Sequence, residues 1–415
     1  MDDNKQKNKR ILVFSQHFWP EEFRVNDICR GFVEQGFSVD VVCGIPNYFG
    51  GKVYKGWGFF KRMREEWHDI NIRRVWEIPR GSNTFFRIFF NYISWPFFCF
   101  FYLPFIGRGY DRVMVYQLSP VLMAFPAIVY RFFTKTPLTI YMLDYWPVSF
   151  YAIIDLKNRL LRRILSGVSK WHYKRADNIV VVYEGIKKLL IDDAGVDPSN
   201  ISFIPQSCEK IHETCLFDEN LHNKYEGCFC IVFTGSINPA QSFDIIVQAA
   251  KLCYDAGLTD IHWVIVGDGM SRKNVEEMVA ESGLEDNFHF EGAYPVEEMP
   301  RFYSITDAFI VALKKSKLGD FGVPAKIQSY LAAGKPILGA MDGDAAELIN
   351  KNRVGLCGPS DSAEVLFENI REIYLSDESQ RKEMGERAKQ CYFEHFERDV
   401  TMKKLISFIF SGEGE

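Results

Sequence analysis

Four stretches in the second half of the chain combine glycine, amide and charged side chains in a way that suits a phosphate group. They are Thr234–Gln241 (TGSINPAQ), Val264–Gly269 (VIVGDG), Pro324–Pro336 (PAKIQSYLAAGKP) and Asp342–Ile349 (DGDAAELI). Gly235 follows an apolar run, so the backbone there can approach a diphosphate and the amides of the next helix start can hold its charge. Lys326 supplies a cation for a leaving phosphate.

Each of these signals has an alternative explanation. Lys326 could be an exposed helix residue, and Gly267 and Gly269 could form a simple turn at a strand end. Glu347 follows Gly343 at a predicted helix start, where helix capping would also explain an acid.

The first half contains a second set of polar residues, in loops that follow apolar runs. His17, Glu21, Glu22 and Arg24 lie after the first run, and these charges could position an acceptor or balance its diphosphate. A solvated loop and a structural histidine are the alternatives. Asp144 follows another apolar run and is the best candidate for a carboxylate at the site, although helix capping would place an aspartate there equally well.

Apolar runs of strand length alternate with helix-length amphipathic stretches in both halves. Such alternation predicts parallel sheets covered by helices, the doubly wound α/β class. We expect two such domains, at 1–205 and 206–394, with a final helix at about 395–415 that packs back on the first. Ligands bind beyond the carboxyl ends of parallel strands, so two such sheets that face each other would form a central cleft.

Charge is distributed unevenly over the 415 residues, although the net charge is only -5. Residues 1–180 carry 26 Lys and Arg against 15 Asp and Glu, and the remainder carries 23 against 39. The net charge argues against nucleic acid as a partner. The 10 cysteines contain no Cys-x-x-Cys pair and the N-terminus has no secretory h-region, so a reduced, cytoplasmic setting is expected.

Two segments of the positive half point to a membrane. Residues 85–106 (FFRIFFNYISWPFFCFFYLPFI) are apolar except for Arg87. Their length permits a span, but strands on both sides of them must share one sheet; a pair of buried helices broken at Pro96 and Pro104, and a monotopic patch, are the other readings. Residues 157–175 are amphipathic and strongly basic, which suits an anionic lipid surface or a solvated helix face.

The four glycine-containing stretches, in this order, resemble the C-terminal domain of GT-B glycosyltransferases, in particular glycosyltransferase family 4. Four stretches of the first half resemble the N-acetyl-fucosaminyl (L-fucosamine) transferases of bacterial surface polysaccharides in that family: His17–Arg24, Pro46–Tyr48, Gln117–Pro120 and Asp144–Pro147. The resemblance implies a GT-B fold, a retaining transferase without metal or cofactor, and a nucleotide-sugar donor, with UDP expected as the nucleotide. It further implies a lipid-diphosphate-linked acceptor in O-antigen or capsule synthesis at the cytoplasmic face of the inner membrane.

The resemblance also implies roles for individual residues. Catalytic roles fall to Asp144, Lys326 and Asp320. Donor-binding roles fall to Gly235, Ser236, Asn238, Gln241, Gly267, Asp268, Gly292, Ser329 and Glu347, and acceptor-side roles to His17, Glu21, Glu22, Arg24 and Asn47. Many members carry a pair of glutamates where this chain has Phe321 and Ser329.

Other protein classes were weighed against this interpretation. A nicotinamide enzyme would need Gly-x-Gly-x-x-Gly after the first strand, where Ser15–Pro20 (SQHFWP) stands instead. A catalytically silent membrane-associated partner protein and a nucleotide-sugar epimerase of the same fold remain alternatives, because both glutamate positions are altered.

Overall fold

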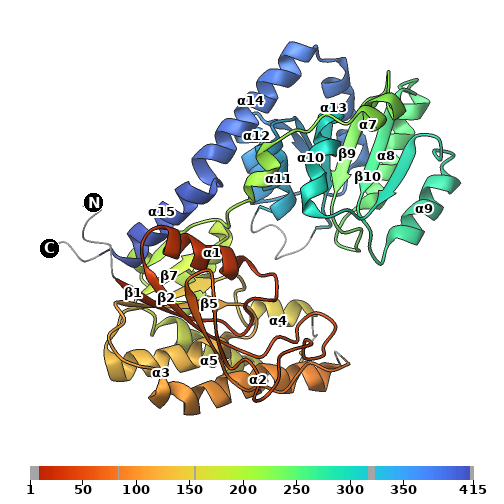
Figure 1. Ribbon diagram of the computed structural model, residues 1–415. Coiled ribbons are helices and arrows are strands. Elements are labelled where there is room, and N and C mark those ends of the chain that lie inside the picture. Colours follow the sequence, from red (N-terminus) through yellow and green to blue (C-terminus); the bar gives the residue numbers. More distant parts are fainter. Residues whose placement is uncertain (1–8, 83, 154–155, 316–322, 412–415) are drawn as a thin grey trace. The chain divides into compact units, whose positions relative to one another are not determined.

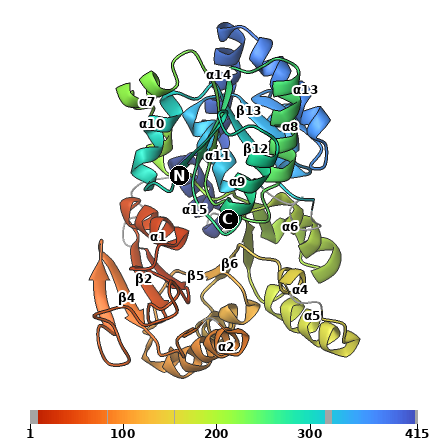
Figure 2. The same ribbon diagram turned by 90° about the vertical axis from the view of Figure 1, so that its right-hand side faces the viewer.

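The computed structural model describes residues 9–82, 84–153, 156–315 and 323–411. The chain divides into two compact units, of which one runs to Pro205 and resumes at Met402 and the other is Gln206–Thr401. Each unit has its own sheet and its own hydrophobic core (Figures 1 and 2).

The N-terminal unit is built on a sheet with the strand order β3-β4-β2-β1-β5-β6-β7-β8. All neighbouring strands pair in parallel except β3 and β4. The strands are β1 (Arg10–Phe14), β2 (Ser38–Cys43), β3 (Arg64–Trp67), β4 (Ile70–Arg74), β5 (Arg112–Gln117), β6 (Leu138–Met142), β7 (Asn178–Val181) and β8 (Ile201–Phe203). The helices are α1 (Arg24–Glu34), α2 (Phe85–Tyr102), α3 (Phe125–Thr134), α4 (Val148–Ile153), α5 (Arg159–Tyr173), α6 (Glu184–Leu189) and α15 (Arg398–Ile409).

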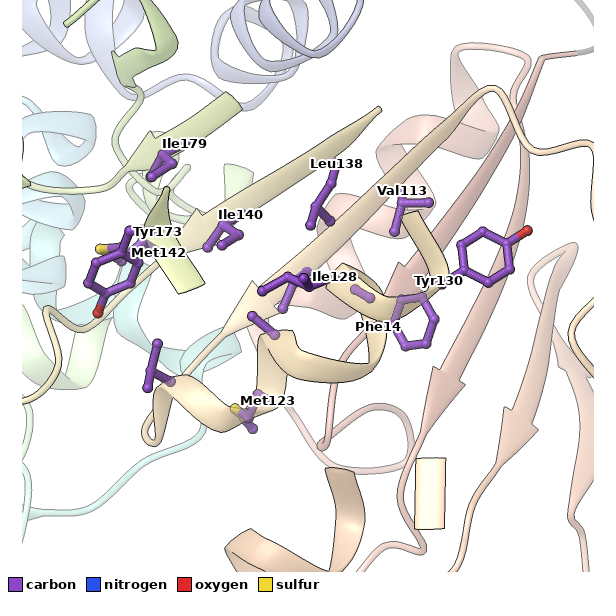
Figure 3. Close-up of a cluster of buried hydrophobic side chains, with 14 of the residues drawn as sticks. Phe14, Val113, Met123, Ile128, Tyr130, Leu138, Ile140, Met142, Tyr173 and Ile179 are labelled. Carbon is purple, nitrogen blue, oxygen red and sulfur yellow. The ribbon is translucent and has the colours of Figure 1, made fainter. Parts of the chain in front are cut away.

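Helices cover both faces of this sheet, because its central strands are apolar on both sides. One core cluster joins the sheet to α2, α3 and α5, which lie along the same side of it in Figure 1. Figure 3 shows part of this cluster: Val113, Ile140 and Ile179 come from neighbouring strands, and Met123 and Ile128 come from the segment that forms α3. The other face is covered by α1 and α15.

The second unit repeats the architecture with a sheet that is parallel throughout, in the order β11-β10-β9-β12-β13-β14. Its strands are β9 (Phe229–Thr234), β10 (Ile261–Val266), β11 (Phe288–Gly292), β12 (Ala308–Ala312), β13 (Ile337–Ala340) and β14 (Gly355–Gly358). Its helices are α7 (Glu219–Lys224), α8 (Phe243–Asp255), α9 (Arg272–Glu281), α10 (Met299–Ser304), α11 (Ala325–Ala333), α12 (Asp344–Lys351), α13 (Ala363–Leu375) and α14 (Glu378–His395). The predicted doubly wound α/β class is confirmed in both units.

The aromatic segment differs from one of its predicted forms. The prediction of two helices broken at Pro96 is wrong, because α2 is one helix that continues through Pro96. Only Pro104 falls in a break, the short turn Leu103–Phe105 that follows α2. One face of α2 is packed in the core through Trp95 and Cys99. The stretch Phe86–Phe105 is long and apolar enough to cross a membrane, yet 28% of it is buried inside the protein.

The final helix of the chain is α15, which begins slightly later than the expected residue 395. The chain turns at Phe396 and Glu397, because Phe396 is buried in the second unit and the Glu397 carboxylate accepts a hydrogen bond from the Val400 amide at the start of α15. The rest of α15 joins the first unit, where Ile409 accepts a hydrogen bond from the Arg112 guanidinium and Phe410 stacks on Phe37.

We expect α15 to contribute strongly to the stability of the first unit. Leu405 is 2% exposed, so Leu405→Ala should cost about 2–4 kcal/mol through lost burial and an unfilled cavity. Hydrogen exchange in α1 and β1 should accelerate accordingly, whereas Lys403→Ala, on the exposed side of the same helix, should leave it unchanged. Equal exchange in both variants would contradict this role.

Candidate functional site

In the second unit, the loops that leave β9 and β10 are joined into one surface at the carboxyl edge of the sheet. The Gly235 amide donates to the Val266 carbonyl at 2.9 Å, and the Ile237 amide donates to the Asp268 carbonyl at 2.9 Å. A Cβ on Gly267 would lie 1.8 Å from the Gly235 oxygen, and one on Gly269 would lie 2.2 Å from the Ile237 oxygen. Glycine is therefore required at both positions for this close approach.

The same loop is attached to the end of β12 on its other side. The Ser242 amide donates to the Ala312 carbonyl at 3.1 Å, and the Lys314 amide donates to the Ala240 carbonyl at 3.0 Å. Asn238 accepts a hydrogen bond from the Ala240 amide, so its side chain holds the turn. The loop thus presents Gln241 in a fixed position.

Lys326, near the start of α11, points into this loop. Its ammonium donates to Gln241 Oε1 at 2.8 Å and lies 3.9 Å from the centre of the Phe233 ring. It lies only 3.6 Å from the point where a Gly235 Cβ would stand. Burial lowers the pKa of Lys326 to about 7, and it forms no ion pair with any carboxylate in the described residues. The structure therefore brings Gln241 and Gly235 together around the Lys326 ammonium, which has no charged partner in the part of the chain that the structure describes.

The remaining donor-side residues fall into two groups. Ser236 and Asp268 are exposed on the joined loops, and Gly292 ends β11 in register with Val266 at the same edge. Ser329 is directed elsewhere: its hydroxyl donates to the Ala325 carbonyl of its own helix and lies 3.6 Å from Cys208 Sγ. Asp320 lies outside the described residues.

Glu347 lines a separate, open cavity of about 480 Å³ at the ends of β13 and β14. Asp342 and Gly343 share this lining, and Glu347 is exposed in the first turn of α12. Ser360 donates a hydrogen bond of 2.7 Å to Asp342.

Among the described residues, one group of side chains could hold a metal ion, namely Cys208, Glu209 and His212, whose ligand atoms lie within 4.8 Å of one another. His212 Nδ1 is already 2.6 Å from the Tyr303 hydroxyl. Cys208 also lies 3.6 Å from the Ser329 hydroxyl of α11.

In the first unit, the structure brings three predicted residues together at the carboxyl end of β1. His17 Nδ1 lies 3.0 Å from Glu21, and Glu21 also accepts hydrogen bonds from the amides of Asn47 and Tyr48 at 2.6 and 2.5 Å. All of them except Tyr48 are almost fully buried. Glu21 is therefore occupied in holding the loop after β2, which differs from the expectation that it faces an acceptor.

Beneath this loop lies a buried acid that the sequence analysis missed, Glu77. Its carboxylate accepts from Gln16 at 2.6 Å, from Asn47 at 2.7 Å and from Asn91 of α2 at 3.2 Å. Burial raises the pKa of Glu77 well above its usual value, and the hydrogen bond from Gln16 opposes that shift. Asn91, a polar residue in the middle of an apolar helix, was the one sequence signal for this network.

Several buried polar atoms at this edge have no hydrogen-bond partner in the described residues. They are Gln16 Oε1, His17 Nε2, Gln117 Oε1 and Arg80 Nε. With Nδ1 of His17 donating to Glu21, its Nε2 is an acceptor, so most of these atoms are acceptors. Unsatisfied buried polar atoms are rare in proteins, and their concentration here indicates a place for a ligand rich in hydroxyl groups.

Asp144 lies after β6 on the same side of the sheet. It accepts a hydrogen bond from the Ser119 hydroxyl at 2.9 Å, and its carbonyl accepts one from the Gln117 amide at 3.2 Å. Burial raises the pKa of Asp144, and the Ser119 hydrogen bond opposes the rise. Glu22 is exposed, and Arg24 is the first residue of α1.

Comparison with known proteins connects both halves to sugar transfer. Residues 22–207 match the model of Glycosyltransferase Family 4, and residues 217–391 match that of the glycosyl transferases group 1. The chain is 27% identical over 207 residues to a 2-deoxystreptamine glucosyltransferase of Streptomyces kanamyceticus, an alignment that covers 48% of this chain and 52% of that protein. It is 28% identical over 273 residues to the probable glycosyltransferase WbjE of Pseudomonas aeruginosa, covering 62% and 64%.

The chain thus matches between about half and two thirds of the length of these curated relatives. Among solved structures, Anabaena HepE in complex with UDP has the same fold, with a TM-score of 0.70, 14% identity, and coverage of 97% of this chain and 100% of that chain. The two parallel-sheet units are those of the GT-B fold.

Because Lys326 has no carboxylate partner among the described residues, we expect it to lower the stability of the second unit while it strengthens ligand binding. Lys326→Met removes a desolvated ammonium and should stabilise the second unit by about 1–3 kcal/mol, while it should weaken UDP binding at least tenfold. The folded pKa of about 7 lies below the usual lysine value near 10.4. The unfolded wild type therefore binds the extra proton between these values, so wild-type stability should rise with pH across that window and approach that of the variant.

Chemical denaturation at pH 6.5, 8 and 9.5 and calorimetry with UDP measure both effects. Lys273→Met, at an exposed position of α9, is the control. A variant that is less stable than the wild type at every pH, or that binds UDP normally, would contradict the assignment.

Proposed function

The chain consists of a Glycosyltransferase Family 4 domain followed by a glycosyl transferases group 1 domain, and we propose that it moves a sugar from a nucleotide diphosphate to an acceptor hydroxyl. One observation carries the proposal: a partly desolvated ammonium, Lys326, lies beside Gly235 at the strand edge with no carboxylate partner among the described residues. Such a cation is costly unless an anion binds it, and a diphosphate is the anion that glycine loops and helix starts accommodate.

The donor in this proposal is a UDP-sugar. HepE, which shares the fold, forms a complex with UDP. Gly235, Gln241 and Lys326 would contact the diphosphate, and the joined loops with Ser236, Gly267 and Asp268 would border the nucleotide. The separate cavity at Glu347 would accept part of the donor sugar.

The proposed reaction retains the anomeric configuration and uses neither metal nor cofactor, as the family resemblance implies. The bond between the anomeric carbon and the diphosphate oxygen breaks, a bond from the anomeric carbon to the acceptor oxygen forms, and the proton of the acceptor hydroxyl passes to the departing diphosphate. Lys326 would stabilise the negative charge that develops on the departing diphosphate, which is the largest electrostatic demand of the step.

The acceptor would bind at the carboxyl edge of the first sheet. The unpaired acceptor atoms of Gln16, His17 and Gln117 match the hydroxyl donors of a sugar, and the unpaired Arg80 Nε adds a donor. Glu21, Asn47 and Glu77 would hold these groups in place, and Asp144 would line the same edge. Motifs of the first half favour a lipid-diphosphate-linked acceptor of surface polysaccharide synthesis (O-antigen or capsule), and an N-acetylated deoxyhexosamine as the sugar transferred.

Attachment to the cytoplasmic face of the inner membrane, peripheral or monotopic, completes the proposal. Phe86, Phe90 and Phe97 of α2 and Phe105 of the turn that follows it are 52–72% exposed. Phe100 of α2 lies 6.0 Å from Phe125 of α3, which lies 6.4 Å from Trp171 of α5, so aromatic contacts link the three helices. At the start of α5, Leu160, Leu161 and Ile164 are exposed among arginines instead of facing the core. A large apolar face beside basic residues suits an anionic bilayer.

Incubation with a panel of UDP- and GDP-sugars and a lipid-diphosphate-linked sugar acceptor tests the transfer. We expect turnover with a UDP-sugar that is insensitive to EDTA, and a product whose anomeric configuration by NMR equals that of the donor. No turnover with any donor, together with no thermal shift from UDP or GDP, would leave a catalytically silent partner protein as the better explanation. Epimerised free nucleotide-sugar as the product would identify an epimerase.

Sedimentation with phosphatidylglycerol vesicles tests the membrane face. Each Lys or Arg near an anionic surface contributes about 1 kcal/mol, so Arg159→Glu with Arg163→Glu should lower vesicle binding more than tenfold. Phe90→Ser with Phe105→Ser should lower it even on neutral vesicles. Lys273→Glu with Lys382→Glu, an equal charge change on exposed positions of the second unit, is the control; equal losses in control and test variants would contradict the assignment.

A further inference from the structure

An aromatic groove of about 400 Å³ lies on the first unit. It lies between α2 and two short segments, one that leads into β3 and one at the end of β4. Phe59, Phe60, Trp76, Phe98 and Phe101 supply most of its walls, and Arg64 lies among them. We propose that this groove binds the part of a prenyl chain that is next to the phosphate of the lipid-linked acceptor. The inference rests on the proposed function, because that function supplies such an acceptor.

The groove walls are apolar surfaces that the fold leaves uncovered. Phe60 is 82% exposed, Phe101 58% and Trp76 38%. These rings contact one another at the groove, since Phe60 lies 5.1 Å from Trp76 and Trp76 lies 6.1 Å from Phe98. The Trp76 indole N–H already donates to the Phe59 carbonyl, so the ring offers a ligand an apolar face. The occupant must therefore be a hydrocarbon.

The groove lining carries positive charge. Arg64, which lines the groove, is exposed and forms no ion pair with a described residue, and Lys61 and Arg62, just before it in the chain, are also exposed. Arg74 is different: it is buried, pairs with Glu65 and donates to the carbonyls of Trp19 and Gly44, so it forms the floor. An apolar groove whose lining carries positive charge complements an amphiphile that has an anionic phosphate at one end of a hydrocarbon chain.

The groove and the polar edge proposed to bind the acceptor sugar are formed by the same two segments of the chain. Consecutive residues after β4 serve the two regions, because Trp76 borders the groove and Glu77 belongs to the buried network. Helix α2 does the same with Phe98 and with Asn91, which is seven residues earlier and so about 10 Å away along the helix axis. A chain in the groove would therefore place its phosphate near the Gln16 and His17 cluster.

Calorimetry with farnesyl diphosphate, in solution without vesicles or detergent and below its micelle concentration, tests the groove. We expect saturable binding and a blue shift of tryptophan emission that Trp76→Phe abolishes. Phe60→Asp should weaken binding at least tenfold, and Arg64→Gln should weaken binding of farnesyl diphosphate but not of farnesol. Phe105→Asp is the matched control, because Phe105 is 69% exposed at the end of α2 and does not line the groove.

Three results would overturn the inference. They are the absence of saturable binding, equal binding by Phe60→Asp and the wild type, and a Trp76 signal that arises only with phospholipid vesicles or only as the protein self-associates on sedimentation. UDP thermal shift and hydrolysis of the donor, measured on the same Phe60→Asp sample, should be unchanged. The two proposals can thus fail separately. Binding of farnesyl diphosphate without any donor binding would contradict the transferase proposal, and donor turnover without farnesyl diphosphate binding would contradict the groove proposal.

Discussion

Parallel pairing is the constraint from which the rest of this structure follows. When neighbouring strands run in the same direction, every loop that leaves a strand at its carboxyl end reaches the same edge of the sheet. In the second unit this brings the loops after β9 and β10 so close that a side chain at Gly267 would overlap the Gly235 carbonyl. The loops are then fixed by backbone hydrogen bonds on both sides, and Lys326 is held against a rigid surface. In the first unit the same constraint gathers Gln16, the loop after β2 and Gln117.

The two edges carry opposite chemical deficits, and this makes them suited to different parts of one reaction. At the edge of the second unit an anionic partner is missing, since no carboxylate among the described residues offsets the cost of burying the Lys326 ammonium. At the edge of the first unit the deficit is in hydrogen-bond donors, since buried oxygen and nitrogen acceptors remain unpaired. A diphosphate removes the first deficit and sugar hydroxyls remove the second. Ligands of the proposed kinds would relieve both deficits.

The sequence was most informative where local chemistry decides structure. Apolar runs ending in glycine predicted β9 and β10 with their loops, and the phosphate role of Lys326 stays a prediction. The β3–β4 pair was missed because Arg64–Trp67 (REEW) is mostly charged and Ile70–Arg74 (INIRR) is mostly polar, unlike the apolar runs of the buried strands. Glu77 was missed because its network joins four distant segments, and no spacing in sequence encodes that meeting. The role of Glu21 was misjudged for a similar reason: its partners, the amides of Asn47 and Tyr48, are backbone groups that carry no residue identity.

Helix α2 shows how one segment serves two environments. The proline rule predicted a break at Pro96, but the neighbouring core contacts of Trp95 and Cys99 hold the helix through it. Its inward face also carries Asn91 and Ser94, whose hydrogen bonds to the segment around Ile78 attach the helix to the sheet. Removal of α2 into a bilayer as a true span would break these bonds and expose the core beneath. The phenylalanines on the outward face of α2, in contrast, belong to no core cluster of the described residues, whereas phenylalanine rings elsewhere in the chain are usually buried or half-buried. A helix that is fixed to its domain on one side and apolar on the other can meet a membrane only along its length, and this geometry favours the monotopic patch among the alternatives that the sequence left open.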